Sequence, residues 1–182
     1  MFRRLALGLL CFSFATTAWA ANELSNRRAP GFSLSAPNLK QYDLADFRGK
    51  VILLNFMKTD CPNCSAFSKI LAEAQEKYRG RLQVLSIAPS PPETQNSVRG
   101  YLNRNGINQV VLFDCRQVAI SYFKLSPANP TFDVPHVFVI DQRGRIREDY
   151  GYNALNRGIF EEEDLFPIIE RYVSKSGSSA AE

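Results

Sequence analysis

The sequence predicts an α/β fold in which helices flank one central mixed β-sheet. An almost continuous apolar run at 51–56 is typical of a strand that is covered on both faces. After this run, segments with helix and strand patterns alternate along the chain. Two further strands, joined by the turn sequence at 141–144, and a last helix complete the series. One mixed sheet accommodates all of these elements.

Length and composition limit the class of protein. The chain has 182 residues, enough for one domain of ordinary size. It is 45% hydrophobic and 22% charged, which excludes a fibrous repeat, a disordered protein and a polytopic membrane protein. The formal net charge is only +4, and Arg3 and Arg4 at the extreme N-terminus contribute to it. We therefore expect no nucleic-acid partner.

The first residues have the pattern of a secretory signal peptide. A basic start is followed by an apolar run at 5–15 and by the small-x-small cleavage pattern at 18–20. An uncleaved membrane anchor is the alternative, but a spanning helix needs about 20 apolar residues. The expected organisation is a signal peptide at 1–20, a flexible segment at 21–27, a folded domain at 28–175 and a disordered tail at 176–182.

The first elements after the strand at 51–56 have local causes in the sequence. At 62–79 apolar residues recur every three or four positions, which predicts a helix with Gly80 as its C-terminal cap. The alternating segment at 82–87 predicts a second strand. Residues 90–93 (SPPE) have the capping-box pattern and predict a helix that begins there and ends before Gly106.

The second half of the domain continues the alternation. A third strand is predicted at 109–113, and Asp114 is expected to cap a short helix after it. Strands at 137–140 and 145–150 form the predicted hairpin. The last helix is expected at 161–175, where acidic residues at its start favour the helix dipole.

Two cysteines open the helix at 62–79. Unpaired N–H groups and the dipole at a helix N-terminus stabilise a thiolate. Cys61 is expected to be the more exposed sulfur and therefore the nucleophile. Cys64 lies one turn further on and is expected to be the covered, resolving thiol. The spacing thus predicts a redox-active pair that forms a reversible disulfide.

Two other interpretations of the pair are weaker. A structural disulfide across two residues gains little chain entropy. A zinc site needs two more ligands, and beyond the pair the exported chain offers only Cys115 and His136. We therefore expect redox chemistry without a metal or another cofactor.

Three segments carry a resemblance to a known family. Residues 55–64 (NFMKTDCPNC) resemble the NFWAxWCPxC signature of the TlpA/ResA-like periplasmic thioredoxins, which belong to the thioredoxin-like superfamily with the redoxin and AhpC/TSA proteins. Similar segments lie upstream, at 29–34 and 44–54, and downstream, at 134–141. The resemblance implies a thioredoxin-like fold with an N-terminal β extension, in a protein of the periplasm. It also implies thiol:disulfide oxidoreductase activity in the reducing direction.

The resemblance also implies a third catalytic residue, Pro135, in the downstream segment. The resemblance implies that Pro135 follows a cis peptide bond beside the cysteine pair. X-Pro bonds are the place where the cis form costs little. Because proline has no N–H, the backbone of Val134 is expected to remain free to pair with an incoming peptide.

The sequence departs from the signature around the pair. Met57 and Asp60 stand in place of its two tryptophans, and Lys58 replaces a small residue. The negative charge of Asp60 disfavours a neighbouring thiolate, whereas the positive charge of Lys58 favours it. Asn63, a neutral hydrogen-bond donor, predicts a less oxidising pair than a histidine would give.

Three other residues are assigned by weaker signals. Asn55 stands where thioredoxin has a buried acid, so the usual proton acceptor for the resolving thiol is expected to be missing. His136 is either a partly buried strand residue or a group near the cysteine pair, where it would stabilise a thiolate or bind a metal. Cys115 is expected to be a passive buried thiol.

The expected partners are protein thiols and disulfides, with a membrane or periplasmic thiol as electron donor, and the chain is expected to be a monomer. The alternative function is a copper-handling module that binds Cu(I) through Cys61 and Cys64, with or without His136. A peroxiredoxin needs Pro and Thr seven and three residues before its reactive cysteine. Leu54 and Lys58 occupy those positions, which argues against peroxidase activity.

Overall fold

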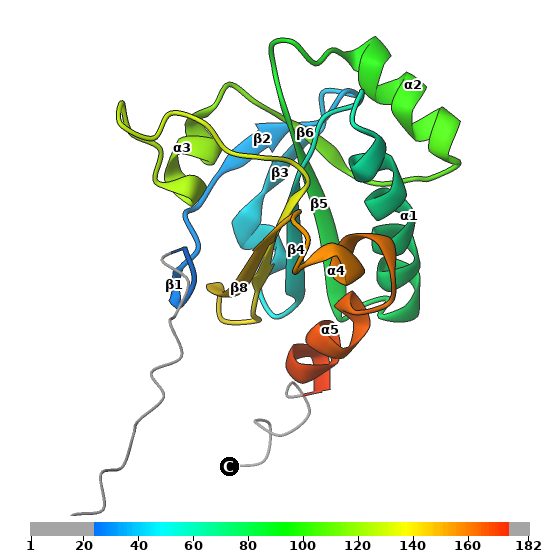
Figure 1. Ribbon diagram of the computed structural model, residues 1–182, viewed down its shortest axis with the longest axis vertical. Coiled ribbons are helices and arrows are strands. Elements are labelled where there is room, and N and C mark those ends of the chain that lie inside the picture. Colours follow the sequence, from blue (N-terminus) through cyan, green and yellow to red (C-terminus); the bar gives the residue numbers. More distant parts are fainter. Residues whose placement is uncertain (1–23, 175–182) are drawn as a thin grey trace, which may run out of the picture.

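A six-stranded mixed sheet forms the centre of the computed structural model, which describes residues 24–174 (Figure 1). Its strand order is β1-β8-β7-β4-β5-β6. β4, β5 and β6 run parallel, whereas β7, β8 and β1 pair antiparallel. The strands are β1 (Arg27–Arg28), β4 (Val51–Phe56), β5 (Leu82–Pro89), β6 (Val111–Asp114), β7 (His136–Ile140) and β8 (Arg145–Gly151). The predicted α/β class with a mixed sheet is confirmed.

Helices and a short hairpin cover the two faces of this sheet. The hairpin consists of β2 (Ser33–Ser35) and β3 (Gln41–Asp43), and a short 3-10 helix, η1 (Leu44–Phe47), follows it. The helices are α1 (Pro62–Lys77), α2 (Gln95–Asn105), α3 (Gln117–Phe123), α4 (Arg157–Glu161) and α5 (Leu165–Val173). In Figure 1, α3 and the N-terminal hairpin lie on the side of the sheet away from α1.

Strand β4 divides the core between the two faces. Val51 and Leu53 point to the face covered by α1, α4 and α5, where they pack with Phe67 and Phe160. Their neighbours Ile52, Leu54 and Phe56 point to the opposite face and pack against α3 and the N-terminal segment. All six residues of β4 are buried, as the unbroken apolar run predicted.

Two predicted helix starts and ends differ from the structure. α1 ends at Lys77 rather than 79, and Gly80, with φ +83°, belongs to the turn into β5. The capping box proposed at 90–93 is wrong, because α2 begins at Gln95 and is capped by Thr94 and Ser97. The consecutive prolines at 91 and 92 have no N–H to contribute to a helix.

The short helix α3 is capped from the end of β6. The Asp114 carboxylate accepts hydrogen bonds from the backbone N–H groups of Val118 (3.1 Å) and Ala119 (2.9 Å). The predicted capping role is therefore right, although Arg116 occupies the residue before the helix. Arg116 has φ +75°, in the left-handed region.

The single last helix predicted at 161–175 is wrong, because two helices stand in its place. α4 ends at Glu161 and α5 begins at Leu165, with extended backbone at Glu162. Four consecutive acidic residues at 161–164 would repel one another in one continuous helix. The break also buries hydrophobic residues on both sides of it, Ile159 and Phe160 in α4 and Leu165 and Phe166 in α5.

Contacts with β8 order the N-terminal part of the described chain. The Asn26 N–H donates to the Ile146 carbonyl oxygen (2.8 Å), and the Ser25 hydroxyl donates to Asp149 (2.5 Å). Residues 25 and 26, in the segment expected to be flexible, therefore contact the sheet. The predicted signal peptide and tail lie outside the described residues. No helix within 24–174 is long and apolar enough to cross a membrane.

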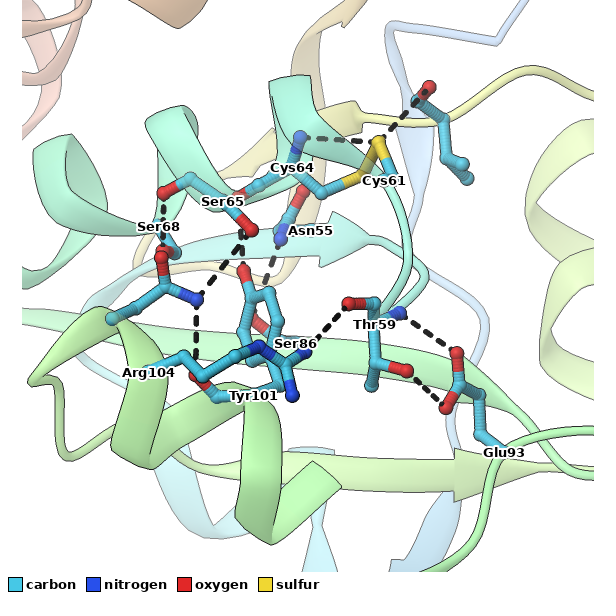
Figure 2. Close-up of a disulfide and its surroundings, with 12 residues drawn as sticks. Asn55, Thr59, Cys61, Cys64, Ser65, Ser68, Ser86, Glu93, Tyr101 and Arg104 are labelled. Carbon is cyan, nitrogen blue, oxygen red and sulfur yellow. Dashed lines mark hydrogen bonds between the residues drawn. A yellow bond between two sulfur atoms is a disulfide. The ribbon is translucent and has the colours of Figure 1, made fainter. Parts of the chain in front are cut away.

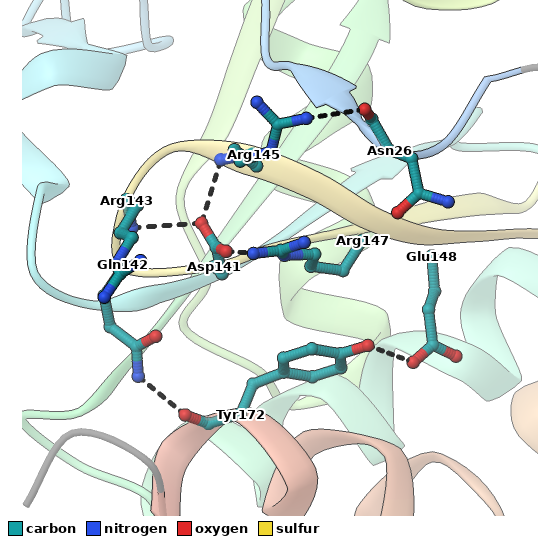
Figure 3. Close-up of polar contacts among 8 residues, drawn as sticks. All are labelled: Asn26, Asp141, Gln142, Arg143, Arg145, Arg147, Glu148 and Tyr172. Carbon is teal, nitrogen blue, oxygen red and sulfur yellow. Dashed lines mark hydrogen bonds and ion pairs between the residues drawn. The ribbon is translucent and has the colours of Figure 1, made fainter. Parts of the chain in front are cut away.

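Asp141 fixes the turn between β7 and β8 (Figure 3). Its buried carboxylate accepts the backbone N–H groups of Arg143 (3.0 Å) and Arg145 (2.9 Å), and it pairs with the Arg147 guanidinium at 2.6 Å. Gln142 in the same turn donates to the Tyr172 carbonyl oxygen of α5 at 2.6 Å. The predicted hairpin is confirmed, and it is tied to the last helix.

Candidate functional site

Cys61 and Cys64 form a disulfide at the N-terminus of α1 (Figure 2). Their Cα atoms lie 5.2 Å apart, and Cys61 is the residue that caps the helix. The backbone N–H of Cys64 donates to the sulfur of Cys61 over 3.1 Å. The same N–H stabilises a thiolate at Cys61 after reduction, because helix N-termini favour negative charge.

The two sulfur-bearing residues differ in exposure. Cys64 is fully buried, in a cluster with Met57, Val98 and Tyr101, whereas Cys61 is partly exposed. A thiol of another protein therefore reaches Cys61 more readily than Cys64. This asymmetry suits a pair in which one sulfur attacks and the other resolves.

Glu93 and Arg104 clamp the turn that leads to Cys61. The buried Glu93 carboxylate accepts hydrogen bonds from the backbone N–H and the hydroxyl of Thr59, both at 2.7 Å. Its second oxygen also accepts the Ser97 hydroxyl at the start of α2 (2.5 Å). Arg104 donates to the Thr59 carbonyl oxygen at 3.2 Å. The polar groups of Thr59, two residues before Cys61, are thus held from both sides (Figure 2).

Two buried polar groups lie beneath the start of α1. The Tyr101 hydroxyl donates to the Cys64 carbonyl oxygen over 2.9 Å, and burial raises the pKa of this phenol. Asn55 lies on the face of β4 that carries Leu53 and Met57, and its amide donates to Ser86 (3.3 Å). The Asn55 side-chain oxygen is buried without a hydrogen-bond partner. No acidic side chain occupies this position.

Val134 brings a free backbone segment to the cysteine pair. Its carbonyl oxygen lies 4.0 Å from the Cys61 sulfur, and the Val134–Pro135 peptide bond is cis. β7 begins at His136, so Val134 precedes the paired register of the sheet. The structure thus places Pro135 where the resemblance implied.

His136 lies in an aromatic environment at the start of β7. Its ring contacts Phe123 (4.8 Å between ring centres) and Phe138 (4.7 Å), and its Nε2 lies 3.4 Å from an Asp149 carboxylate oxygen. Within residues 24–174, no three His, Cys, Asp or Glu side chains are grouped to hold a metal ion. Within this part of the chain His136 is thus not grouped with the cysteine pair as a third ligand, and it is a partly buried strand residue.

The remaining predicted residues lie at the surface around the pair. Lys58 and Asp60 are exposed, and Asn63 is partly exposed in the first turn of α1. Cys115 is exposed after β6, which corrects the expectation of a buried thiol. The strand before it ends at Asp114, whose side chain turns inward to cap α3, so the next side chain faces solvent.

Glu93, Tyr101 and Arg104 are site residues that the sequence does not predict. The pattern at 90–93 places Glu93 in a capping box, and no sequence signal singles out Tyr101 or Arg104. Glu93 does have a signal in the sequence. Because Thr94 can cap the helix by itself, the Glu93 carboxylate is not needed as a cap and is available for another contact.

The model of the AhpC/TSA family matches residues 26–149, well over half of the chain. The chain belongs to the AhpC/TSA family. Within this family it is similar to thiol-disulfide oxidoreductase ResA of Bacillus anthracis, with 30% identity over 122 residues, 67% of this chain and 66% of the relative. It is also similar to the thioredoxin-like protein YneN of Bacillus subtilis, with 25% identity over 67% of this chain and 68% of the relative.

Solved structures share the fold. A putative thioredoxin from Neisseria meningitidis superposes on this AhpC/TSA protein with a TM-score of 0.64 and 26% identity, covering 86% of this chain and 94% of the other. A thiol:disulfide interchange protein from Chlorobium tepidum shares the fold, with a TM-score of 0.65 and 21% identity over 81% and 96% of the two chains. The thioredoxin-like fold and the ResA-like resemblance are confirmed. The chain spans just under two thirds of the ResA relative.

Proposed function

We propose that this protein is an exported thiol:disulfide oxidoreductase whose Cys-Pro-Asn-Cys pair reduces disulfides in other proteins. The observation that carries the proposal is the disulfide itself. It joins a partly exposed sulfur to a buried one at a helix N-terminus, 4.0 Å from the free carbonyl oxygen of Val134. The ResA relatives named thiol-disulfide oxidoreductases support the same class of reaction.

The reaction proceeds by two thiol–disulfide exchanges. In the reduced protein the Cys61 thiolate attacks one sulfur of a client disulfide, and the other client sulfur leaves as a thiolate that takes up a proton. Cys64 then loses its proton and attacks the Cys61 sulfur of the mixed disulfide. This step releases the second client thiol and forms the Cys61–Cys64 disulfide. Two electrons and two protons pass to the client, and a thiol donor must restore the pair.

Groups around the pair assist these exchanges. The backbone of Val134, held by cis-Pro135, aligns the client segment beside Cys61. Lys58 and Asp60 exert opposite effects on the Cys61 thiolate, and the neutral Asn63 keeps the pair from being strongly oxidising. No metal or other cofactor takes part in this mechanism.

The cellular setting belongs to the same proposal. The leader pattern at 1–20 supports export to the periplasm, where a membrane or periplasmic thiol would supply electrons. Protein thiols and disulfides are the partners, and we propose that the chain acts as a monomer.

Active-site variants test the mechanism. In insulin reduction with dithiothreitol, Cys61→Ser is expected to abolish the protein's acceleration of the reaction, because the nucleophile is lost. Cys64→Ser should accumulate a mixed disulfide with a client, detected by mass spectrometry, because no resolving thiol remains. Cys115→Ser is the matched control and should retain the parental rate. Parental rates in both active-site variants would refute the mechanism.

The direction of electron flow requires a separate measurement. Equilibration of the pair with glutathione gives its reduction potential. A potential near that of thioredoxin, about −270 mV, supports a reductase, whereas a potential near that of DsbA, about −120 mV, contradicts it.

A further inference from the structure

A pocket of about 250 Å³ opens next to the cysteine pair, where the parallel strands β4, β5 and β6 end. Met57 and Lys58, at the end of β4, form one wall, and Val134 lies beside them. Val134 also approaches Cys61, and Met57 packs in the same cluster as Cys64. The pocket therefore lies directly beside the disulfide, at the carboxyl ends of the strands, where α/β sheets bind ligands.

The inner surface of this pocket is mostly apolar. Phe132 comes from the segment before Pro135, and Pro91 and Pro92 come from the loop after β5. Ala119 of α3 closes the floor together with Phe56 and Ile87. A cavity of about 150 Å³ is enough to hold benzene, so this pocket has room for one large side chain but not for a drug-sized ligand.

The exposed charged groups that line the pocket are positive. Lys58 and Arg116 are both exposed at the pocket. Asp114 also lines it, but its buried carboxylate already accepts the backbone N–H groups of Val118 and Ala119. The two cations are thus uncompensated within the lining, and an anionic group of a ligand would complement them.

Arg116 has a second function in this wall. Its left-handed backbone (φ +75°) lies just before α3, and its guanidinium donates to the Pro130 carbonyl oxygen over 2.9 Å. This bond holds the segment that carries Thr131 and Phe132 over the pocket. Conformations that are rare for a residue other than glycine concentrate at functional sites.

We propose that this pocket selects client proteins in which an aromatic or large aliphatic residue, together with an acidic residue, adjoins the disulfide cysteine. The proposal rests on the oxidoreductase function above and names the class of its substrates. While the client backbone lies along Val134, the apolar side chain fills the pocket and the carboxylate faces Arg116. Burial of the apolar side chain and opposite charge then both favour the mixed disulfide with Cys61.

Peptides with a chromogenic leaving group test this selectivity. Four synthetic peptides carry one cysteine as a mixed disulfide with thionitrobenzoate, preceded by Phe or Ala and followed by Glu or Lys in all four combinations. Cys61 of the reduced protein attacks the peptide sulfur and releases coloured thionitrobenzoate, after which Cys64 releases the peptide thiol. The Phe and Glu peptide should react about tenfold faster than the Ala and Lys peptide at low salt.

Two variants separate the apolar and the charged contributions. Thr131→Trp fills the pocket from its exposed edge and should abolish the preference for Phe over Ala. Ala128→Trp, in the same exposed segment but outside the lining, is its control. Arg116→Gln should lower the preference for Glu over Lys about threefold, and added salt should do the same in the parent, where the bond to Pro130 is intact. Arg116→Lys keeps the positive charge and should retain this preference. Lys69→Gln makes an equal charge change on the exposed surface of α1 and should have no effect.

The small disulfide 2-hydroxyethyl disulfide distinguishes the two proposals. Equal rates with all four peptides, together with normal reduction of this compound, would overturn the pocket proposal and leave the oxidoreductase function intact. Loss of both reactions in the parent would instead refute the function itself. A preference for Phe and Glu that Thr131→Trp and Arg116→Gln left unchanged would also exclude the pocket as its origin.

Discussion

At the scale of single residues, Glu93 links the redox site to the second helix. Its carboxylate accepts three hydrogen bonds, two from Thr59 and one from Ser97, while it is almost completely buried. A buried carboxylate is stable only when such donors replace water. The position of Thr59, and through it the approach to Cys61, therefore depends on a residue more than 30 positions away in sequence.

Glu93→Ala is expected to lower the free energy of unfolding of the oxidised protein by about 1–3 kcal/mol, because the partly buried N–H and hydroxyl of Thr59 lose their acceptor. Glu93→Gln should lose less, since its amide oxygen still accepts from that N–H. Urea unfolding followed by circular dichroism measures both. If the alanine variant were as stable as the parent, the clamp would have no energetic role.

At the scale of elements, the β7–β8 hairpin depends on one side chain. Asp141→Ala removes the acceptor of two backbone N–H groups and the partner of Arg147, and we expect it to lower the free energy of unfolding by about 2–4 kcal/mol. Asp141→Asn keeps an acceptor oxygen but loses the charge, so its effect should be smaller. Thermal unfolding ranks the variants, and the exposed Asp46→Ala is the control. Equal effects of Asp141→Ala and Asp46→Ala would contradict this role.

Elements with a strong local pattern could be predicted from the sequence, and those governed by distant contacts could not. β4 and α1 follow from an apolar run and from helical spacing, so Cys61 and Cys64 could be placed at their junction. The start of α2 could not be predicted, because Glu93 has the pattern of a helix cap and only the folded structure shows its contact with Thr59. The exposure of Cys115 is a different case: it follows from the inward turn of Asp114, whose capping role the sequence predicts, so the usual burial of cysteine is a poor guide at this position.

At the scale of the whole molecule, tyrosines determine the response to alkaline pH. Burial, followed by the hydrogen bond to Glu148, raises the pKa of Tyr172 to about 12. Burial raises the pKa of Tyr122 and, together with the same glutamate, that of Tyr150. In the unfolded chain these phenols ionise near pH 10. Because the folded values are higher, their contribution to stability is complete below about pH 10 and is lost as the pH rises towards the folded values.

The free energy of unfolding should accordingly fall between pH 10 and about 12, where the unfolded tyrosines release protons first. Tyr172→Phe should make this fall shallower, whereas Tyr42→Phe, which removes a tyrosine that is not bonded to Glu148, should leave its slope unchanged. Urea unfolding at pH 9, 10 and 11, in a Cys115→Ser background that prevents disulfide exchange, measures the slope. An identical slope in the parent and the Tyr172 variant would contradict the assignment.

The strand order leaves the central sheet with short edges. The two edges of its central sheet are β1, of two residues, and β6, of four, so neither presents a long row of unpaired backbone groups. Long exposed edges recruit further strands and seed aggregation. For the proposed reaction with client proteins, Val134 beside the sulfurs is then the expected pairing point, and within residues 24–174 the edges of the central sheet offer little further template. We therefore expect complexes with proteins that expose hydrophobic segments to form and dissociate without strand addition at the sheet edges.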